Sequence, residues 1–115
     1  MNMINFEQAF LKYFEIYGED FYWYMLINNQ EYFEHQAKTE IREGHPCYGR
    51  TLHAIARCSA NDDVLYTLDD DTFVILHLTF TRNHEDKYPR TVFFSTTEEV
   101  LAYIERCYIA FYYES

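Results

Sequence analysis

Aromatic residues recur at spacings of three and four along the first eighteen positions, which is the pattern of one apolar face of an α-helix. The residues with this spacing are Phe6, Phe10, Tyr13, Phe14 and Tyr17. We expect this helix to begin near Asn5, because Asn5 and Gln8 have the form of a capping arrangement. We expect it to end at Gly18, because glycine readily adopts the left-handed conformation that closes a helix.

The next stretch, residues 21–27, is aromatic or aliphatic at every position. A segment that is apolar all round is usually buried, and Asp20 can cap it as a second helix. After a short interruption, a more polar helix is predicted over residues 30–41. Residues 1–41 are therefore assigned to helices.

The second half of the chain has the pattern of strands. Four stretches rich in β-branched and aromatic residues are separated by short polar connections, which is typical of an antiparallel meander. The predicted strands are residues 51–58, 63–68, 72–81 and 90–95. A loop over residues 42–50, with two of the three glycines, joins them to the helices. Residues 73–80 are apolar on both faces apart from His77 and Thr79, so we expect a central strand that is covered on both sides.

The connection between the second and third predicted strands has specific turn chemistry. Asp70 and Asp71 stand in the position of a two-residue hairpin loop, where aspartate tolerates a positive φ. This register places His77 opposite Val64, in the middle of a central strand.

A last helix follows the sheet. Ser95 and Glu98 have the spacing of a capping box. The apolar face behind it comprises Val100, Leu101, Ile104, Cys107, Tyr108 and Phe111. The order of elements predicts an α+β fold in which this helix packs on the sheet. The predicted organisation is one domain, 1–115, with helices over 1–41, a four-stranded antiparallel sheet over 51–95 and a helix over 96–113.

The charge of the chain narrows the classes of partner. Nine basic and nineteen acidic residues give a formal net charge of −10, which opposes binding to a nucleic-acid backbone or to an anionic membrane. The first sixteen residues lack the pattern of a secretion signal, and no apolar run reaches the roughly 20 residues of a membrane helix. The three cysteines are widely spaced, as free thiols are. We expect a cytoplasmic protein.

Histidine and cysteine residues supply the candidate chemistry. His45, Cys47, His53 and Cys58 are acceptable zinc ligands, but His53 and Cys58 point to opposite faces of the predicted strand, so all four could converge only if a β-bulge intervenes. Cys47 beside His45 is the one loop candidate for a cysteine nucleophile, and His77 is a candidate base. No phosphate-binding loop, nucleophile elbow or zinc-protease motif is present in the sequence. We therefore expect no metal, no cofactor and no enzymatic activity.

The acidic residues are unevenly distributed. Residues 1–41 and residues 58–80 each carry a net charge of −5, whereas residues 42–57 carry +2. Tyrosine beside carboxylate suits the binding of a basic protein surface, because the ring supplies rigid contact area and the carboxylates steer the encounter. The residues predicted to form such a surface are Glu31, Tyr32, Glu34, Asp62, Asp63, Asp69, Asp70, Tyr112 and Tyr113. Turn formation is the alternative role of the aspartates, and solubility that of the acidic charge.

In size, charge and aromatic content, and in the meander over residues 65–80, the chain resembles the small acidic immunity proteins that bacteria make against toxin domains. The resemblance implies a non-enzymatic partner that occludes a basic toxin surface, such as that of a nuclease. One alternative is a ligand-binding protein or small enzyme with a pocket between sheet and helices that contains His53, His77 or the His45/Cys47 loop. Another is a homodimer that closes aromatic patches against itself.

Overall fold

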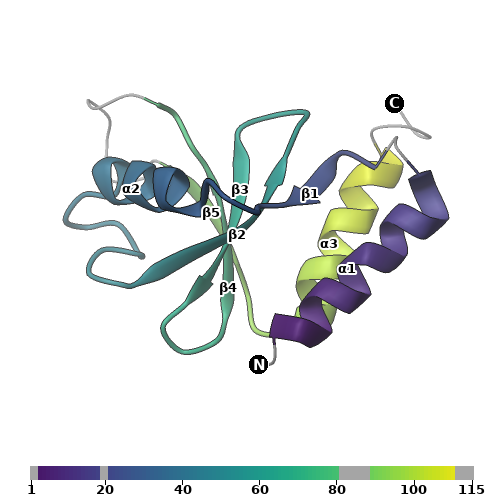
Figure 1. Cartoon of the computed structure of the whole chain (residues 1–115). Coiled ribbons are helices and arrows are strands. Elements are labelled where there is room, and N and C mark those ends of the chain that lie inside the picture. Colours follow the sequence, from purple (N-terminus) through teal and green to yellow (C-terminus); the bar gives the residue numbers. More distant parts are fainter. Residues whose placement is uncertain (1–2, 19–20, 81–88, 111–115) are drawn as a thin grey trace.

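The computed structural model of the chain describes residues 3–18, 21–80 and 89–110. The five strands form one antiparallel sheet in the order β1-β2-β3-β4-β5, so strands that follow one another in the sequence are neighbours (Figure 1). The fold is α+β, as predicted, with a fifth strand added. The elements are α1 (Met3–Tyr17), β1 (Trp23–Met25), α2 (Gln30–Glu40), β2 (Leu52–Cys58), β3 (Asp63–Leu68), β4 (Phe73–His77), β5 (Arg90–Phe94) and α3 (Thr97–Ile109).

Helices cover both faces of the sheet, α2 on one face and α1 with α3 on the other (Figure 1). Successive side chains of a strand point to opposite faces. In β4, Phe73 and Ile75 belong to the core against α1 and α3, whereas Val74 and Leu76 belong to the core against α2. Each such side chain stabilises the fold by about 1.5–3 kcal/mol. The prediction that this strand is covered on both sides is confirmed, although the strand ends at His77.

The helix predicted over residues 21–27 is wrong, because β1 lies there. Its three residues pair with Ala56, Arg57 and Cys58 of β2. The backbone pairing extends on both sides, since Ser59 N donates to Tyr22 O at 2.7 Å and Leu26 N donates to Ile55 O at 3.0 Å. A short run that is apolar at every position suits a buried strand as well as a buried helix. As a strand, the segment satisfies its backbone groups by pairing with the outer edge of β2.

The hairpin between β3 and β4 has a three-residue loop, Asp69–Asp71, and not the predicted two-residue loop. Leu68 N donates to Thr72 O at 2.8 Å, and Asp71 N donates to Leu68 O at 3.0 Å. This is the pattern of a type I turn followed by one residue in the left-handed conformation. That residue is Asp71, with a φ of 66°.

The extra loop residue changes the register of the hairpin by one position. His77 lies opposite Asp63, where the shorter loop would have placed Val64. Because side chains alternate between the two faces of a sheet, a register shift of one residue changes which side chains lie beside each other on the same face. The longer loop therefore brings a histidine and a carboxylate together at one end of the sheet.

A β-bulge interrupts β2. The pairing of β2 with β3 skips Ile55, so Ala54 and Ile55 both turn backbone groups toward the outer edge of the strand. Ala54 N donates to the Glu34 carboxylate of α2 at 2.9 Å, and Ile55 O accepts the bond from Leu26. Both groups are satisfied, and the first of these bonds holds α2 against the strand.

The ends of the helices follow capping chemistry. Gly18 follows α1 with a φ of 70°, as predicted. The cap of α3 is Thr96 and not Ser95: the Thr96 hydroxyl accepts from Glu99 N, and the Glu99 carboxylate accepts from Ser95 N, both at 3.2 Å. The sequence of residues 95–99 allows a capping box in either register. Within the described ranges, none of the helices has the length and apolar character needed to cross a bilayer.

Glu40, at the end of α2, is a completely buried carboxylate that joins this helix to the end of β4. It accepts hydrogen bonds from the backbone N and the hydroxyl of Thr79, both at 2.7 Å, from Phe80 N at 2.9 Å and from Gln36 Nε2 at 2.8 Å. These donors replace the water that the carboxylate loses on burial. Phe80 has a φ of 56°, which is uncommon for a bulky residue, so the bonds also hold a strained backbone.

We expect Glu40→Gln to lower the free energy of unfolding by about 2–4 kcal/mol, because the amide turns N–H groups toward donors that need an acceptor. Glu43→Gln, at an exposed position in the next loop, is the matched control and should change it by less than about 0.5 kcal/mol. Urea denaturation, followed by the fluorescence of the single tryptophan, Trp23, measures both. Equal midpoints for the two variants would contradict a stabilising role of Glu40.

We expect Asp71→Val to destabilise the fold by about 1–2 kcal/mol, because a β-branched residue is strained at positive φ. Asp71→Asn should have a smaller effect, since asparagine adopts this conformation readily. Thermal unfolding of the two variants beside the wild type gives the comparison. Equal stability of the two variants would argue against the left-handed conformation at this position.

Candidate functional site

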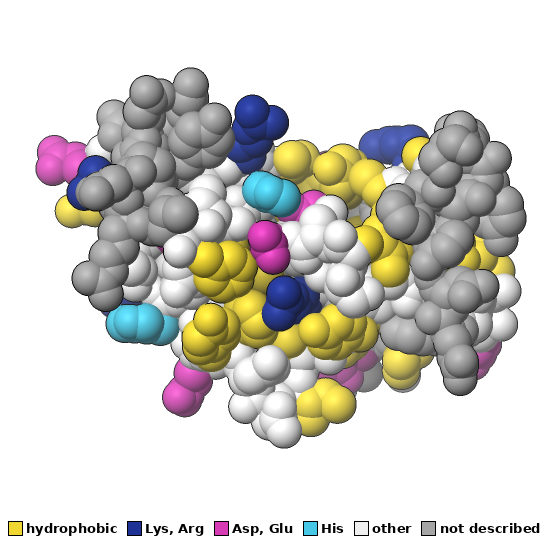
Figure 2. Space-filling view, turned by 90° about the horizontal axis from the view of Figure 1, so that it is seen from above, with side chains coloured by type: hydrophobic (Ala, Val, Ile, Leu, Met, Phe, Trp, Pro, Cys, Tyr) yellow, Lys and Arg dark blue, Asp and Glu magenta, His cyan; other side chains and the backbone are white. Residues whose placement is uncertain are grey.

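The four aspartates predicted from the sequence fall into two groups at opposite ends of β3. Asp62 and Asp63 stand at its beginning, and Asp69 and Asp70 follow its last residue. A strand rises about 3.4 Å per residue, so roughly 20 Å separates the two groups, and they cannot form one site. Tyr112 and Tyr113 lie outside the described residues. On the face shown in Figure 2, acidic, basic and histidine side chains stand singly between hydrophobic ones.

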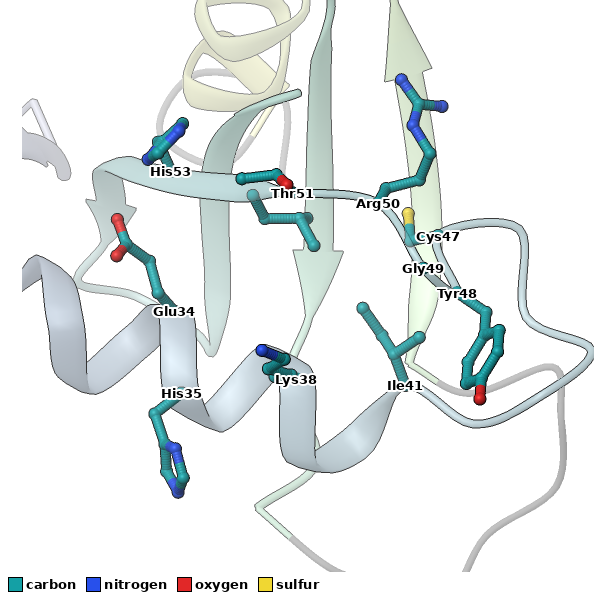
Figure 3. Close-up of a pocket in the computed structure, with 11 residues that line it drawn as sticks. Glu34, His35, Lys38, Ile41, Cys47, Tyr48, Gly49, Arg50, Thr51 and His53 are labelled. Atoms are coloured by element: carbon teal, nitrogen blue, oxygen red, sulfur yellow. The ribbon is translucent and has the colours of Figure 1, made fainter. Parts of the chain in front are cut away.

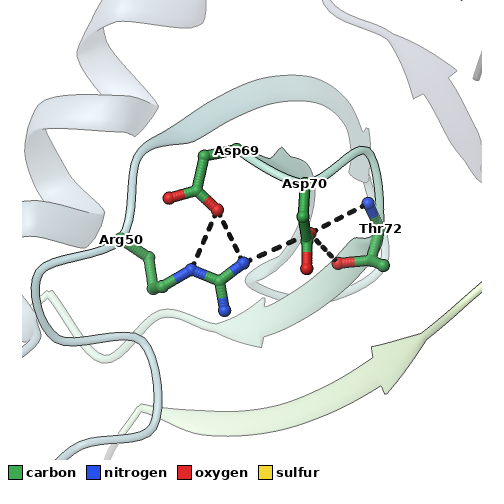
Figure 4. A network of polar contacts seen from close by, with 4 residues as sticks. All are labelled: Arg50, Asp69, Asp70 and Thr72. Carbon is green, nitrogen blue, oxygen red and sulfur yellow. Dashed lines mark hydrogen bonds and ion pairs between the residues drawn. The ribbon is translucent and has the colours of Figure 1, made fainter.

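Arg50 binds both carboxylates of the second group (Figure 4). Its Nε and Nη2 donate to Asp69 Oδ1 at 2.9 and 2.6 Å, and Nη2 lies 3.2 Å from Asp70 Oδ1. Asp70 Oδ1 also accepts from the backbone N of Thr72 at 3.2 Å and from its hydroxyl at 2.5 Å. The hydrogen bond from Arg50 lowers the pKa of Asp69, and the bonds from Thr72 lower the pKa of Asp70. These carboxylates shape the hairpin, and one guanidinium partly neutralises them.

A buried ring brings two of the predicted residues together. The ring of Phe33, on α2, meets the ring of Tyr32 edge-on at a centroid distance of 5.0 Å, and the Arg57 guanidinium lies 5.0 Å from its centroid. Arg57 Nη2 is 3.9 Å from Asp62 Oδ1. Tyr32 is 58% exposed, and Glu31 beside it is exposed in the first turn of the helix. We call the group of Glu31, Tyr32, Arg57 and Asp62, which surrounds the buried ring of Phe33, the Phe33 corner.

Glu34 has a different position from the other predicted acids. Its carboxylate points from α2 to β2, where it accepts the Ala54 N–H (Figure 3). The carboxylate stands where the carbonyl of a further strand would stand if β1 extended along this part of β2. Glu34 therefore has a structural role at the bulge, and it is less free to meet a partner than Glu31.

A cavity of about 620 Å³ lies between α2 and the outer edge of β2. Figure 3 shows Glu34, Lys38 and Ile41 directed from the helix toward the strand, whereas His35 points away. The loop before β2 contributes Cys47 and Arg50, and the strand contributes His53. The cavity thus has the location of the predicted pocket between sheet and helix, and its lining contains both apolar and charged residues.

His45 and Cys47 do not form a nucleophile and base. His45 Nδ1 accepts from Cys47 N at 2.9 Å, so its proton is on Nε2, which donates to Pro89 O at 2.9 Å. His45 is 5% exposed; its Nδ1 bond to Cys47 lies within the loop, and its Nε2 bond holds the loop to the segment before β5. The Cys47 thiol is buried, and burial raises its pKa to about 11. A nucleophilic cysteine needs the opposite shift.

The structure also separates the candidate zinc ligands. Cys47 belongs to the core against α2 and Cys58 to the core on the other face of the sheet. Contrary to the prediction, the bulge in β2 places His53 on the same face of the sheet as Cys58. His53 is nevertheless exposed whereas Cys58 is buried, and the ring of His45 is occupied. Across the ranges that are described, no group of three or more His, Cys, Asp and Glu residues is placed to hold a metal ion.

His77 lies at the end of β4, half exposed, and not in the sheet interior. Its Nδ1 is 2.8 Å from Asp63 Oδ1. Arg90 of β5 lies opposite His77 on the other side, so three polar residues cross the sheet in a row. With Tyr103 of α3 they line a hollow of about 540 Å³. Burial raises the pKa of Tyr103 to about 12, so this phenol stays protonated at neutral pH.

Two arginines of the site were not among the predicted residues. The β2–β3 register pairs residue 52 with residue 68, which carries Arg50 to the side of Asp69 and Asp70. Aligning the two predicted strands as an antiparallel pair, from the sequence alone, would have revealed this contact. The contact of Arg57 with Phe33 joins a strand to a helix, so no spacing in the sequence indicates it.

We expect Cys47 to resist alkylation by iodoacetamide in the native protein, because a thiol with this pKa is only about one thousandth ionised at pH 8. Cys107, which is half buried, should react first. Mass spectrometry of the labelled peptides gives the order, and labelling in urea, where all three thiols are accessible, is the control. Fast native labelling of Cys47 would show that this thiol is reactive.

The described residues thus present an acidic, tyrosine-bearing corner on α2 and β2, a cavity beside it along β2, and a polar row at the end of β3, β4 and β5. Arg50 and the hairpin aspartates form a fourth feature at the opposite end of the sheet. Comparison with protein-family models, with curated proteins and with solved structures finds no match to this chain.

Proposed function

We propose that this protein is a non-enzymatic protein-binding module that engages a basic partner through the Phe33 corner. The observation that carries the proposal is the position of Tyr32, which is 58% exposed while its ring rests edge-on against the buried ring of Phe33. A tyrosine that is already held in place loses little conformational entropy when a partner covers it, so it is a suitable anchor.

The charges around this tyrosine fit a basic partner. Glu31 is exposed beside it and makes no polar contact with a described residue, so its carboxylate is free to pair with an arginine or lysine. Asp62 is half exposed and 3.9 Å from Arg57, a distance that leaves most of its hydrogen-bonding capacity unused. We expect a basic partner seated on Tyr32 to pair with these two carboxylates.

The remaining acidic residues act at longer range. The net charge of −10 attracts a basic surface over about one Debye length, roughly 8–10 Å at physiological salt. Asp69 and Asp70 contribute to this field while they stay bound to Arg50. Such a field raises the association rate more than it raises the final affinity.

The class of partner follows from the type of protein that the chain resembles. A toxin domain whose active-site cleft is basic, such as a nuclease, presents arginine and lysine side chains arranged to bind phosphates. An acidic surface with an anchoring tyrosine is complementary to such a cleft and would block it. We propose an immunity-type role on this basis.

The cavity along β2 favours a second candidate function, the binding of a small ligand. Its volume of about 620 Å³ lies within the range of small-molecule sites, and Lys38, Glu34 and His53 supply polar groups on its walls. A ligand in this cavity would contact the face of α2 that points toward the sheet (Figure 3). It would leave Tyr32 uncovered, so the variants below separate the two functions.

The test uses the whole chain as bait for partners from its own cells, and then the purified partner for kinetics. We expect a basic partner, a loss of affinity of about 10-fold to 100-fold for Tyr32→Ala, and slower, less salt-dependent association for Glu31→Lys. Glu7→Lys makes the same charge change at an exposed position of α1 and is the control. Binding that neither corner variant changes would remove the Phe33 corner from the proposal.

A further inference from the structure

Among the described residues, no strand pairs with the outer edge of β5. β5 is the last strand of the sheet, and it pairs with β4 alone among the described residues. The alternation of an antiparallel ladder shows which groups face outward. Leu68 N donates to Thr72 O and Leu78 N donates to Asp62 O, so the even-numbered residues of β4 bond to β3 and its odd-numbered residues bond to β5.

The same alternation determines which backbone groups of β5 face β4 and which face outward. Residues 73, 75 and 77 of β4 pair with residues 94, 92 and 90 of β5, which therefore turn their N–H and C=O groups inward. Thr91 and Phe93 turn theirs outward. The open edge thus presents two N–H and two C=O groups at regular spacing, and an edge of this kind is ready to pair with a further strand.

The side chains of this edge are apolar. Val92 is 39% exposed on the face of α1 and α3, and Phe93 is 47% exposed on the face of α2. Natural edge strands are usually protected by charged residues, and β5 has one charge, Arg90, at its first position. An exposed, apolar edge strand is the form that sheet-to-sheet association requires.

We propose that a second copy of this chain pairs with β5 in antiparallel orientation about a two-fold axis at Val92. Thr91 of each copy then lies opposite Phe93 of the other, and each pair exchanges two hydrogen bonds. All four outward groups of each edge are used. Val92 lies opposite Val92 of the second copy, and Phe93 lies opposite Thr91. Both exposed apolar side chains of the edge therefore gain a neighbour in the second copy.

The neighbouring registers satisfy the edge less well. An axis at Thr91 would place Phe93 opposite Pro89, which has no N–H to donate. An axis at Phe93 would place Thr91 opposite Ser95, whose N–H already donates to Glu99. In addition, His45 occupies the carbonyl of Pro89, so the open stretch begins at Thr91.

Charge favours a second copy over a basic partner at this edge. Two chains with a net charge of −10 repel each other, so they can associate only where the surface is not acidic. β5 contains no carboxylate, and its single charge is positive. In the proposed register Arg90 lies opposite Phe94 of the second copy and not opposite another arginine, so no like charges face each other across the axis.

Light scattering over a series of protein and salt concentrations tests the proposal. We expect a mass that rises from 14.0 kDa toward twice that value with protein concentration, and more dimer at high salt because salt screens the repulsion. Val92→Lys places two ammonium groups at the axis and should weaken the dimer by more than about tenfold. Ile27→Lys, at a site 85% exposed on another part of the molecule, should not.

Cross-linking tests the register. We expect Val92→Cys to form a disulfide-linked dimer on mild oxidation, because facing residues of such a pair have Cα atoms about 4.5 Å apart. Phe93→Cys, whose side chain faces Thr91 of the second copy, should cross-link far less, and the wild type controls for the three native thiols. A mass of 14.0 kDa under all conditions, or a dimer unaffected by Val92→Lys, would overturn the proposal.

Discussion

The two central strands, β3 and β4, are apolar on both faces, and a sheet of this kind is stable only when helices cover both of its sides. The chain meets this requirement with α2 on one face and with α1 and α3 on the other (Figure 1). Because the faces are used for the core, the groups that remain for interaction lie at strand ends, on strand edges and on the outer sides of helices. The Phe33 corner, the cavity along β2, the polar row with His77 and the open edge of β5 are all in such places.

Many of the acidic residues bind other groups of the protein itself, so fewer carboxylates are available to a partner than the net charge suggests. Glu34 and Glu40 attach the two halves of α2 to the sheet through backbone N–H groups, and Asp69 and Asp70 bind Arg50 and Thr72. Carboxylates suit these positions because they accept several hydrogen bonds at once. The same property explains why acidic residues are frequent at the turns and at the bulge of this sheet.

The two proposed interfaces are on opposite sides of the molecule. The Phe33 corner lies over β2, whereas β5 is three strands away at the other edge of the sheet. A dimer formed through β5 would therefore leave both corners accessible, and it would extend the sheet to ten strands across the axis. Two corners on one particle would raise the apparent affinity for a partner that itself has two binding surfaces.

The sequence by itself determined the elements whose signal is local. The α1 helix with its stop at Gly18, the range of α2, the strands β2, β3 and β5 and the helix α3 follow from periodicity and capping residues that lie within each segment. Only the tertiary structure decided whether residues 23–25 form a strand and which acids are bound internally. Each of these depends on a partner distant in the sequence: β2 for Trp23, Arg50 for Asp69, and the Ala54 N–H for Glu34. A local pattern contains no information about such partners, because the backbone and side-chain groups that compete for them meet only when the sheet and helices are packed.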